Sequence, residues 1–172
     1  MRVLPASLHR TLRTATILAL SGAILSSSGL APAYATPGSG FGPAPISTGK
    51  LGKTNENSVK PGVWNLNVMT NGDSTVGLDQ LTVQGGGYSG WHSHTGIVIA
   101  TVQSGTILWT DAETCTTKSY SVGETFVEPA NRPHYVRNAS ASSTATYSAV
   151  QIRPLGTPGR VDETAPYNNC GL

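Results

Sequence analysis

The stretch GWHSHTGIVIATVQSGTI, residues 90–107, places two histidines directly before an apolar run. His92 and His94 are two residues apart, and residues 96–103 are rich in valine, isoleucine and threonine, which favour β-strands. Side chains two residues apart on an extended segment point to the same face of the pleat. We therefore expect the two imidazoles to lie side by side on the segment that enters a strand.

The rest of the chain contains further short segments of the same β-forming composition. Short segments rich in Val, Ile, Thr, Tyr and Trp are separated by turn residues such as Asn71-Gly72-Asp73 and Ser104-Gly105, and no long apolar pattern has the 3.6-residue period of a helix. Such spacing predicts an all-β sandwich or barrel. The eight expected strands are residues 63–69, 78–84, 96–103, 106–110, 119–122, 125–128, 134–138 and 144–152.

A third histidine begins one of these strands. His134 follows the proline-bounded turn EPANRP, residues 128–133, and after residue 35 the chain contains no histidine besides it, His92 and His94. A His-x-His alone equally fits two polar side chains on the wet face of a sheet. Three imidazoles brought together would suit zinc, copper, iron or nickel better than calcium or magnesium.

The first two histidines fall in a motif that resembles the first motif of the cupin superfamily. That pattern is a glycine, five residues, His-x-His, three or four residues, a glutamate, six residues and a glycine. Here it runs from Gly86 to Gly105, with Val98 at the position of the glutamate. The resemblance therefore comes with a departure, because the usual carboxylate ligand is missing from its place.

The second motif of the same family is a glycine, five residues, Pro-x-Gly, two residues, His, three residues and Asn. Here it runs from Gly123 through His134 to Asn138, with Asn131 in place of the second glycine. Asparagine tolerates a left-handed backbone better than other non-glycine residues, so we expect the turn to keep its shape. We expect Asn138 to be a structural hydrogen-bonding residue.

The resemblance implies a cupin-type jelly-roll barrel with a divalent transition metal (Mn, Fe, Cu, Ni or Zn) bound by His92, His94 and His134. Three-histidine cupins without the glutamate resemble the thiol and diketone dioxygenases, in which the metal keeps open positions for substrate and oxygen. Glu128 could supply a carboxylate from a neighbouring strand. Next to Pro129, however, the alternation of inward and outward side chains does not show which way Glu128 points, and we interpret it as a surface or rim acid. Candidates for the pocket wall, each with core or surface packing as the alternative, are Trp91, Val98, Trp109, Glu128, Tyr147 and Gln151.

Three functions fit this site. The first is an oxygenase or oxidase acting on a small molecule. The second is a zinc-dependent isomerase, lyase or hydrolase, since zinc on three histidines can lower the pKa of bound water to about 7. The third is a non-catalytic metal- or ligand-binding cupin, because the fold hosts binding proteins as well as enzymes.

The ends of the chain indicate its compartment. Residues 1–35 carry three arginines, no acid, a small apolar segment and Ala-Tyr-Ala, which predicts a secretory signal peptide cleaved after Ala35. We predict a flexible N-terminal arm over residues 36–60, a barrel domain with a C-terminal tail over residues 61–172, and an extracellular or periplasmic location without a membrane anchor. Cys115 and Cys170 are expected to form a disulfide, with a free catalytic thiol as the alternative.

The distribution of charged residues indicates which kinds of partner to expect. Three of the eleven Lys and Arg residues lie within residues 1–35, so eight remain against nine Asp and Glu. They are scattered singly, which argues against a nucleic-acid surface. The expected partner is a small-molecule ligand or substrate, and the family resemblance adds a homodimer through sheet edges as an option.

Overall fold

We describe residues 35–172 from a computed structural model of the chain; these residues belong to one compact unit. The predicted signal peptide lies outside the described residues except for Ala35. The strands are β1 (Ser39–Leu51), β2 (Thr54–Lys60), β3 (Trp64–Thr70), β4 (Ser74–Tyr88), β5 (His92–Ser93), β6 (Ile97–Ser104), β7 (Thr106–Asp111), β8 (Thr117–Ser121), β9 (Thr125–Glu128), β10 (His134–Asn138), β11 (Ala145–Pro154) and β12 (Val161–Asp162). A short 3-10 segment, η1 (Tyr167–Gly171), follows them.

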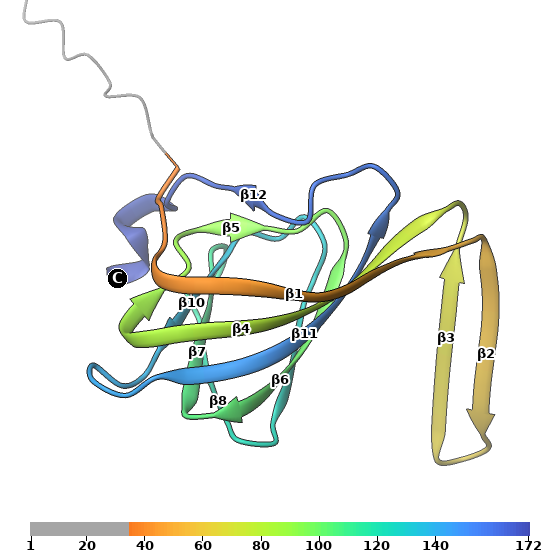
Figure 1. Ribbon diagram of the computed structural model, residues 1–172, viewed down its shortest axis with the longest axis horizontal. Helices are drawn as coiled ribbons and strands as arrows, with labels where there is room; N and C mark the ends of the chain where they lie inside the picture. The colour runs from red at the N-terminus through yellow and green to blue at the C-terminus, as the bar shows by residue number, and fades with distance from the viewer. Residues whose placement is uncertain (1–34) are drawn as a thin grey trace, which may run out of the picture. The chain divides into compact units, whose positions relative to one another are not determined.

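Ten of these strands form one antiparallel sheet that folds over itself into a jelly-roll barrel (Figure 1). One layer has the order β1-β4-β11-β6-β9, and the other has the order β8-β7-β10-β5-β12. The layers join where Arg137 of β10 pairs with Tyr88 of β4. The predicted all-β jelly-roll fold is therefore confirmed.

The core lies between the two layers and follows the period-two alternation of the strands. Along β11, Ala145, Tyr147, Ala149 and Gln151 are buried, whereas the residues between them are partly exposed. These inward side chains meet a cluster of buried apolar residues from the other strands, which includes Val83, Val98, Ala100, Val102, Ile107, Trp109, Phe126 and Val136. The core thus lies inside the barrel, between its two layers.

The predicted flexible arm differs from the structure. Residues 39–51 form β1, which pairs with β4 along its length, from Ser39 opposite Tyr88 to Leu51 opposite Ser74. Its composition, SGFGPAPISTGKL, is that of a loop, but β1 pairs on one side only, and an edge strand tolerates the missing N–H groups of Pro43 and Pro45. This segment is therefore a strand of the sheet and not the loop that its composition suggested.

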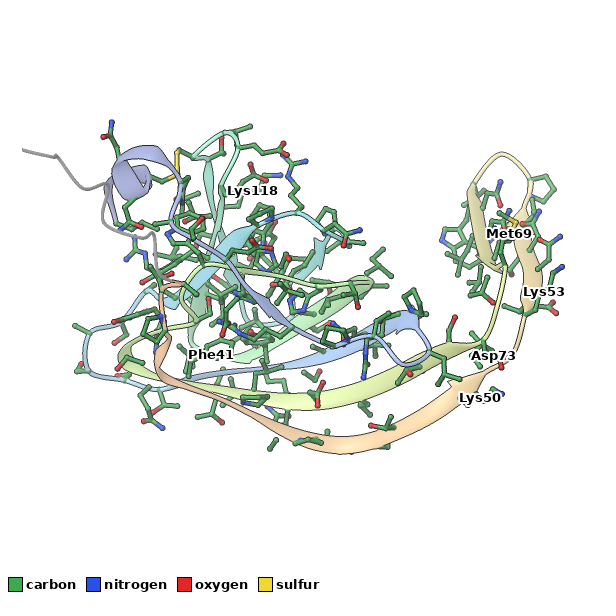
Figure 2. The ribbon with its side chains drawn as sticks, turned by 90° about the horizontal axis from the view of Figure 1, so that it is seen from above. Phe41, Lys50, Lys53, Met69, Asp73 and Lys118 are labelled. Carbon is green, nitrogen blue, oxygen red and sulfur yellow. A yellow bond between two sulfur atoms is a disulfide. The ribbon has the colours of Figure 1, made fainter. Side chains whose placement is uncertain are left out.

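The expected strand at residues 63–69 also has a different setting. It is β3, which pairs only with β2, so the two form a separate hairpin (Figure 1). Trp64 and Met69 are 53% and 62% exposed, so the hairpin adds little to the core. At its base, Lys50 and Asp73 form an ion pair with a separation of 2.6 Å (Figure 2).

The turn of the second motif connects the two motifs. Asn131 has φ of +56°, the left-handed conformation expected for it, and its N–H donates to the carbonyl oxygen of His94 at 2.7 Å. Asn138 is buried, and its amide donates to the carbonyl oxygens of Val83 and Ser143. The predicted structural role of Asn138 is confirmed, since it fastens β10 to β4 and to the loop before β11.

No helix within residues 35–172 has the length and apolar character needed to cross a membrane.

Candidate metal centre

The three histidines meet inside the barrel at the edge of the core, where the ring of Trp109 stacks beside His134. His134 at the start of β10 pairs directly with His92 of β5, and His94 follows β5 by one residue. The ring centroids are 4.3 Å apart for His92 and His134, 5.0 Å for His92 and His94, and 5.2 Å for His94 and His134. His92 and His134 are buried and His94 is partly buried. One nitrogen from each ring lies within 4.8 Å of the others.

Backbone carbonyl groups fix the orientation of all three rings. The Nδ1–H groups of His92, His94 and His134 donate to the carbonyl oxygens of Gly90 (3.0 Å), Gly159 (2.7 Å) and Arg132 (2.9 Å). With the proton held at Nδ1, a neutral imidazole presents the lone pair of Nε2. Hydrogen bonds of this kind are what orients histidines that bind metals.

The tautomer of His94 requires a choice between two contacts. Its Nδ1 lies 2.7 Å from the carbonyl oxygen of Gly159 and 3.0 Å from Nε2 of Gln151. A carbonyl oxygen that close to a ring nitrogen is favourable only if the nitrogen carries a proton. The same carbonyl accepts a 2.6 Å hydrogen bond from Gln151, so Gln151 positions the group that orients His94.

Glu128 faces the same point as the histidines. Its carboxylate oxygens lie 3.0 Å from Nε2 of His94 and 3.2 Å from Nε2 of His134. The side chain is 4% exposed. Our interpretation of Glu128 as a surface or rim acid is therefore wrong. Phe126, two residues earlier, is a buried core residue, and alternation from it places Glu128 on the inner face.

Burial and the neighbouring charges shift the pKa values of these groups. Burial alone would raise the pKa of Glu128, but the adjacent imidazoles of His134 and His94 outweigh it and hold that pKa far below its usual range. Burial would lower the pKa of His134, but the Glu128 carboxylate raises it above its ordinary value. Burial and the charge of His134 keep the pKa of His92 well below its ordinary value. Glu128 is thus an anion that attracts a cation to this point.

The site has polar atoms to offer to such a cation. Nε2 of His94, Nε2 of His134 and Oε1 of Glu128 are buried and have no partner with hydrogen-bond geometry. The short separations to Glu128 are therefore electrostatic contacts without aligned N–H groups. Imidazole nitrogens suit divalent transition metals. The three-histidine cluster can hold a metal of this kind, and the residues fit the cofactor that the sequence suggested.

The site opens onto a cavity of about 230 Å³. Of the predicted wall residues, Val98, Glu128, Tyr147 and Gln151 line it, together with His92 and His94. The remaining lining, which the sequence analysis missed, consists of Phe41, Pro43, Pro45, Asp79, Leu81, Ala149, Gly159 and Arg160. Phe41, Pro43 and Pro45 share one face of β1, so the strand taken for a loop forms one wall.

The two predicted tryptophans do not line the cavity. Trp109 is buried in the core and its ring stacks beside His134 at a centroid distance of 5.6 Å. Trp91 is fully buried, and its ring packs against Tyr135. Both tryptophans are therefore packing residues, and Trp109 packs directly beside His134.

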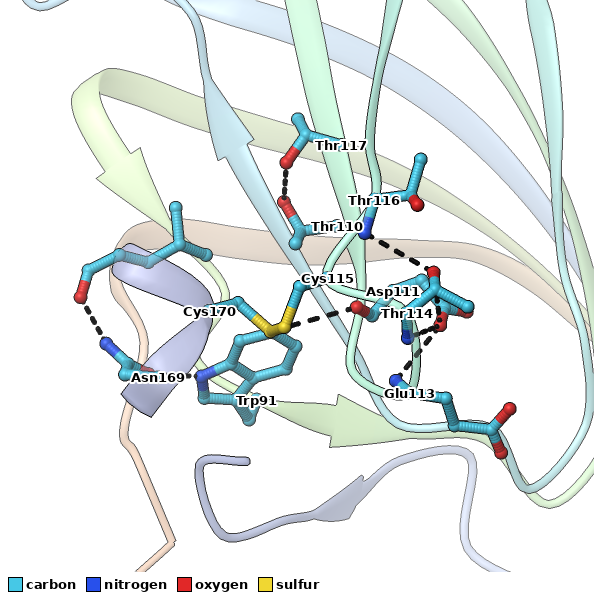
Figure 3. Close-up of a disulfide and its surroundings, with 11 residues drawn as sticks. Trp91, Thr110, Asp111, Glu113, Thr114, Cys115, Thr116, Thr117, Asn169 and Cys170 are labelled. Carbon is cyan, nitrogen blue, oxygen red and sulfur yellow. Dashed lines mark hydrogen bonds between the residues drawn. A yellow bond between two sulfur atoms is a disulfide. The ribbon is translucent and has the colours of Figure 1, made fainter. Parts of the chain in front are cut away.

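A disulfide holds the C-terminal segment next to Trp91. Cys115, in the loop between β7 and β8, is bonded to Cys170 in η1, 55 residues later (Figure 3). Asn169, next to Cys170, accepts a 2.6 Å hydrogen bond from Nε1 of Trp91. The pairing predicted from the sequence is present, and it holds the C-terminal segment against the residue that precedes His92.

No curated protein matches this chain. Residues 80–150, which contain both histidine motifs from His92 to Asn138, match the family model described as "Cupin domain".

Three solved structures illustrate the likeness in fold. A conserved protein of unknown function from Streptococcus pyogenes is 26% identical, with a TM-score of 0.41 over 46% of this chain and 65% of that chain. A cupin-like protein from Thermotoga maritima is 16% identical, with a TM-score of 0.46 over 52% and 65%. An oxalate oxidase in complex with the substrate analogue glycolate is 24% identical, with a TM-score of 0.43 over 51% and 45%. Each alignment spans less than two thirds of the solved chain.

With both motifs inside the matched region and a jelly-roll barrel around them, residues 80–150 form a cupin domain.

Proposed function

We propose that this cupin domain is a secreted metal-dependent oxidoreductase, of oxidase or dioxygenase type, that uses His92, His94 and His134 as metal ligands. The observation that supports this most strongly is the convergence of three oriented imidazoles on the inner end of a small cavity. When bound there, a redox-active metal would supply electron transfer between the substrate and dioxygen, which is the oxidant in this proposal.

The cavity limits the substrate to a small molecule. Its volume of about 230 Å³ is below the roughly 300–1,000 Å³ of pockets that bind drug-sized ligands. Leu81, Val98 and Ala149 make parts of its wall apolar, and Tyr147 is kept as a neutral phenol because burial raises its pKa well above the ordinary value. These walls would exclude water from the reacting end of the substrate.

Charge at the site favours a substrate with an anionic group. Arg160 lines the cavity and is positioned by hydrogen bonds from its guanidinium to the carbonyl oxygen of Ser89 and to Asp162, both 2.7 Å. A divalent metal on neutral imidazoles would add positive charge at the inner end. Asp79 also lines the cavity, and we place the anionic group between the metal and Arg160.

Secretion is the second part of the proposal. The disulfide between Cys115 and Cys170 supports it, because such bonds persist in oxidising compartments. The composition of residues 1–35 supports a signal peptide. Expression of the full chain in an exporting host, followed by N-terminal sequencing of the secreted protein, tests both points. We expect Thr36 to be the first residue.

The proposed activity is tested on the same exported protein. We expect a near-stoichiometric transition metal by plasma mass spectrometry, its loss in a His92→Ala/His94→Ala variant, and consumption of dioxygen with some member of a panel of small carboxylic acids. Reduction of the dioxygen to hydrogen peroxide or water would identify an oxidase, and incorporation of both atoms of labelled dioxygen into the product would identify a dioxygenase. Metal without oxygen consumption, or no metal at all, would overturn the oxidoreductase proposal. Zinc with hydrolytic, lyase or isomerase turnover, or metal without turnover, would point to the two alternatives given above.

A further inference from the structure

A carboxylate stands directly across the sheet from the position where the family pattern has one. Val98 of β6, at the glutamate position of the first motif, pairs with Glu128 of β9 in the antiparallel ladder. Both residues are buried, at 4% and 3% exposure, and both line the cavity. Residues directly opposite in such a ladder have Cβ atoms about 4.5–5.5 Å apart, so a longer side chain on either strand can reach the same point.

The contacts of Glu128 are those of a group that shares a cation with the histidines. One carboxylate oxygen lies 3.0 Å from Nε2 of His94, and the other lies 3.2 Å from Nε2 of His134. Nε2 of His94, Nε2 of His134 and Oε1 of Glu128 are buried and have no hydrogen-bond partner. Leaving buried polar atoms unpartnered is costly, and a metal ion shared by all three would satisfy them.

We propose that Glu128 is the fourth protein ligand of the metal, a carboxylate supplied by β9 in place of the one that Val98 cannot supply from β6. This inference rests on the proposed metal site and adds a residue to it. The ligand set becomes three neutral nitrogens and one anionic oxygen, so a divalent metal keeps a net charge of +1 instead of +2. Such a mixed set suits Mn, Fe and Co better than three imidazoles alone, since carboxylate is the harder ligand.

The alternative is that Glu128 only orients the histidines or holds a proton between them. The affinity of a Glu128 variant alone does not separate the two roles, because both would weaken metal binding. Moving the carboxylate across the sheet does separate them. In a Val98→Glu/Glu128→Val variant the carboxylate returns to the strand used by the family, at the same total volume and charge.

The experiment measures binding of Co²⁺ and Mn²⁺ to the exported full-chain protein after the native metal has been removed by dialysis against a chelator. Affinity is determined by competition with a chromophoric chelator, and coordination by the visible absorption spectrum of the Co²⁺ form. The variants are Glu128→Gln, the Val98→Glu/Glu128→Val exchange, and Glu56→Gln. Glu56 is exposed on the hairpin. Glu56→Gln removes the same charge as Glu128→Gln, so it serves as the control for the change in net charge. Circular dichroism and the unfolding midpoint verify that each variant is folded.

We expect Glu128→Gln to lower the affinity for both ions by about 100-fold or more, since loss of even an outer partner of a ligand costs 10–100-fold. It should also change the Co²⁺ spectrum. The exchange variant should recover most of the affinity and the parental type of spectrum, and Glu56→Gln should match the parent. A Glu128→Gln protein with parental affinity and spectrum, or a folded exchange variant no better than Glu128→Gln, would overturn the inference while leaving the three-histidine site intact. If the parent binds neither ion, the proposed metal site and the inference both fail. If the exchange variant does not fold, the Co²⁺ spectrum of Glu128→Gln decides: a parental spectrum overturns the inference, and a change in band intensity that indicates a different coordination number supports it.

Discussion

Val98 and Glu128 are opposite neighbours on β6 and β9, and both side chains point into the cavity. In the linear sequence they are 30 positions apart and belong to different motifs. The valine at the family's glutamate position therefore does not remove the carboxylate from the site. The carboxylate comes instead from Glu128 on the neighbouring strand β9, and a motif that describes the residues of β6 alone does not include that position.

The N-terminal strand should contribute measurably to stability. Phe41 of β1 is partly buried and its ring lies 6.5 Å from that of Tyr147, whereas Ile46 on the same strand is 58% exposed. We expect Phe41→Ala to lower the free energy of unfolding by about 1–3 kcal/mol and Ile46→Ala to lower it by less than about 0.5 kcal/mol. Denaturant unfolding measures both values. Equal and negligible effects would mean that β1 does not pack on the barrel.

Gln151 should influence metal affinity without binding the metal. Its amide donates to the carbonyl oxygen of Gly159, the same group that accepts from Nδ1 of His94. Gln151→Ala is expected to lower Co²⁺ affinity by about 10–100-fold, as loss of an outer hydrogen bond does. The control is Gln103→Ala, which removes an exposed hydrogen bond to Gln80 and should leave the affinity unchanged. Parental affinity in Gln151→Ala would show that Gly159 holds His94 unaided.

Asp111 should stabilise the disulfide loop in a pH-dependent manner. Its carboxylate accepts hydrogen bonds from the N–H groups of Glu113 and Thr114 and pairs with Arg132. Burial alone would raise the pKa of Asp111, but the hydrogen bonds from Arg132 and Thr114 outweigh it and lower that pKa. A lowered folded-state pKa means that the contribution is complete well above the unfolded value of about 3.9 and is lost as the pH falls through the folded-state pKa.

The corresponding test is Asp111→Asn, followed from pH 7 to pH 2. We expect the variant to be less stable than the parent by about 1–3 kcal/mol at pH 6–7, from the lost charged hydrogen bonds. The difference should shrink as the solution becomes more acidic than about pH 4. Glu113→Gln, which alters only the exposed side of the Arg132 cluster, should change the free energy of unfolding by less than about 1 kcal/mol at any pH. A difference that persists undiminished at pH 2 would exclude the carboxylate charge as its cause.

Removal of the disulfide should cost more than removal of any one hydrogen bond. For a loop closed across 55 residues, the chain-entropy model gives about 4 kcal/mol, so Cys115→Ser/Cys170→Ser should lose about that much in denaturant unfolding. Asn169→Ala keeps the disulfide but deprives the buried indole N–H of Trp91 of its acceptor, at a cost of about 1–3 kcal/mol. A larger loss in Asn169→Ala than in the double serine variant would contradict this order.

The sequence predicted the features that local patterns encode. Valine, isoleucine and threonine mark β6, and the glycine at its end marks the turn to β7. The three histidines could be grouped because two motifs fixed their spacing and placed them on neighbouring strands. Asn131 was predicted to adopt a left-handed backbone, and its φ of +56° agrees.

The features that were missed depend on contacts between distant segments. The composition of β1 predicts a loop, and only an edge position in the sheet makes Pro43 and Pro45 compatible with a strand. Gly159 and Arg160 lie in a segment without any strand pattern, and they reach the site because Gln151 and His94 hold that segment from 8 and 65 residues away. No local sequence pattern predicts contacts between residues so far apart in the sequence. The exclusion of Trp91 from the cavity likewise depends on Asn169 and the disulfide.

Both ends of the described chain are held close to the residue before His92. Oγ1 of Thr36 accepts a 2.8 Å hydrogen bond from the backbone N–H of Trp91, and Asn169, beside Cys170, accepts one from its indole. A bulky label attached next to Thr36 or Asn169 would therefore disturb the hydrogen bonds that hold Trp91. The turn between β2 and β3 carries Val63, 72% exposed, and belongs to a hairpin that shares no strand pairing with the barrel. Attachment at that turn, by a chemistry that leaves the two cysteines untouched, would immobilise the protein without disturbing either of these hydrogen bonds.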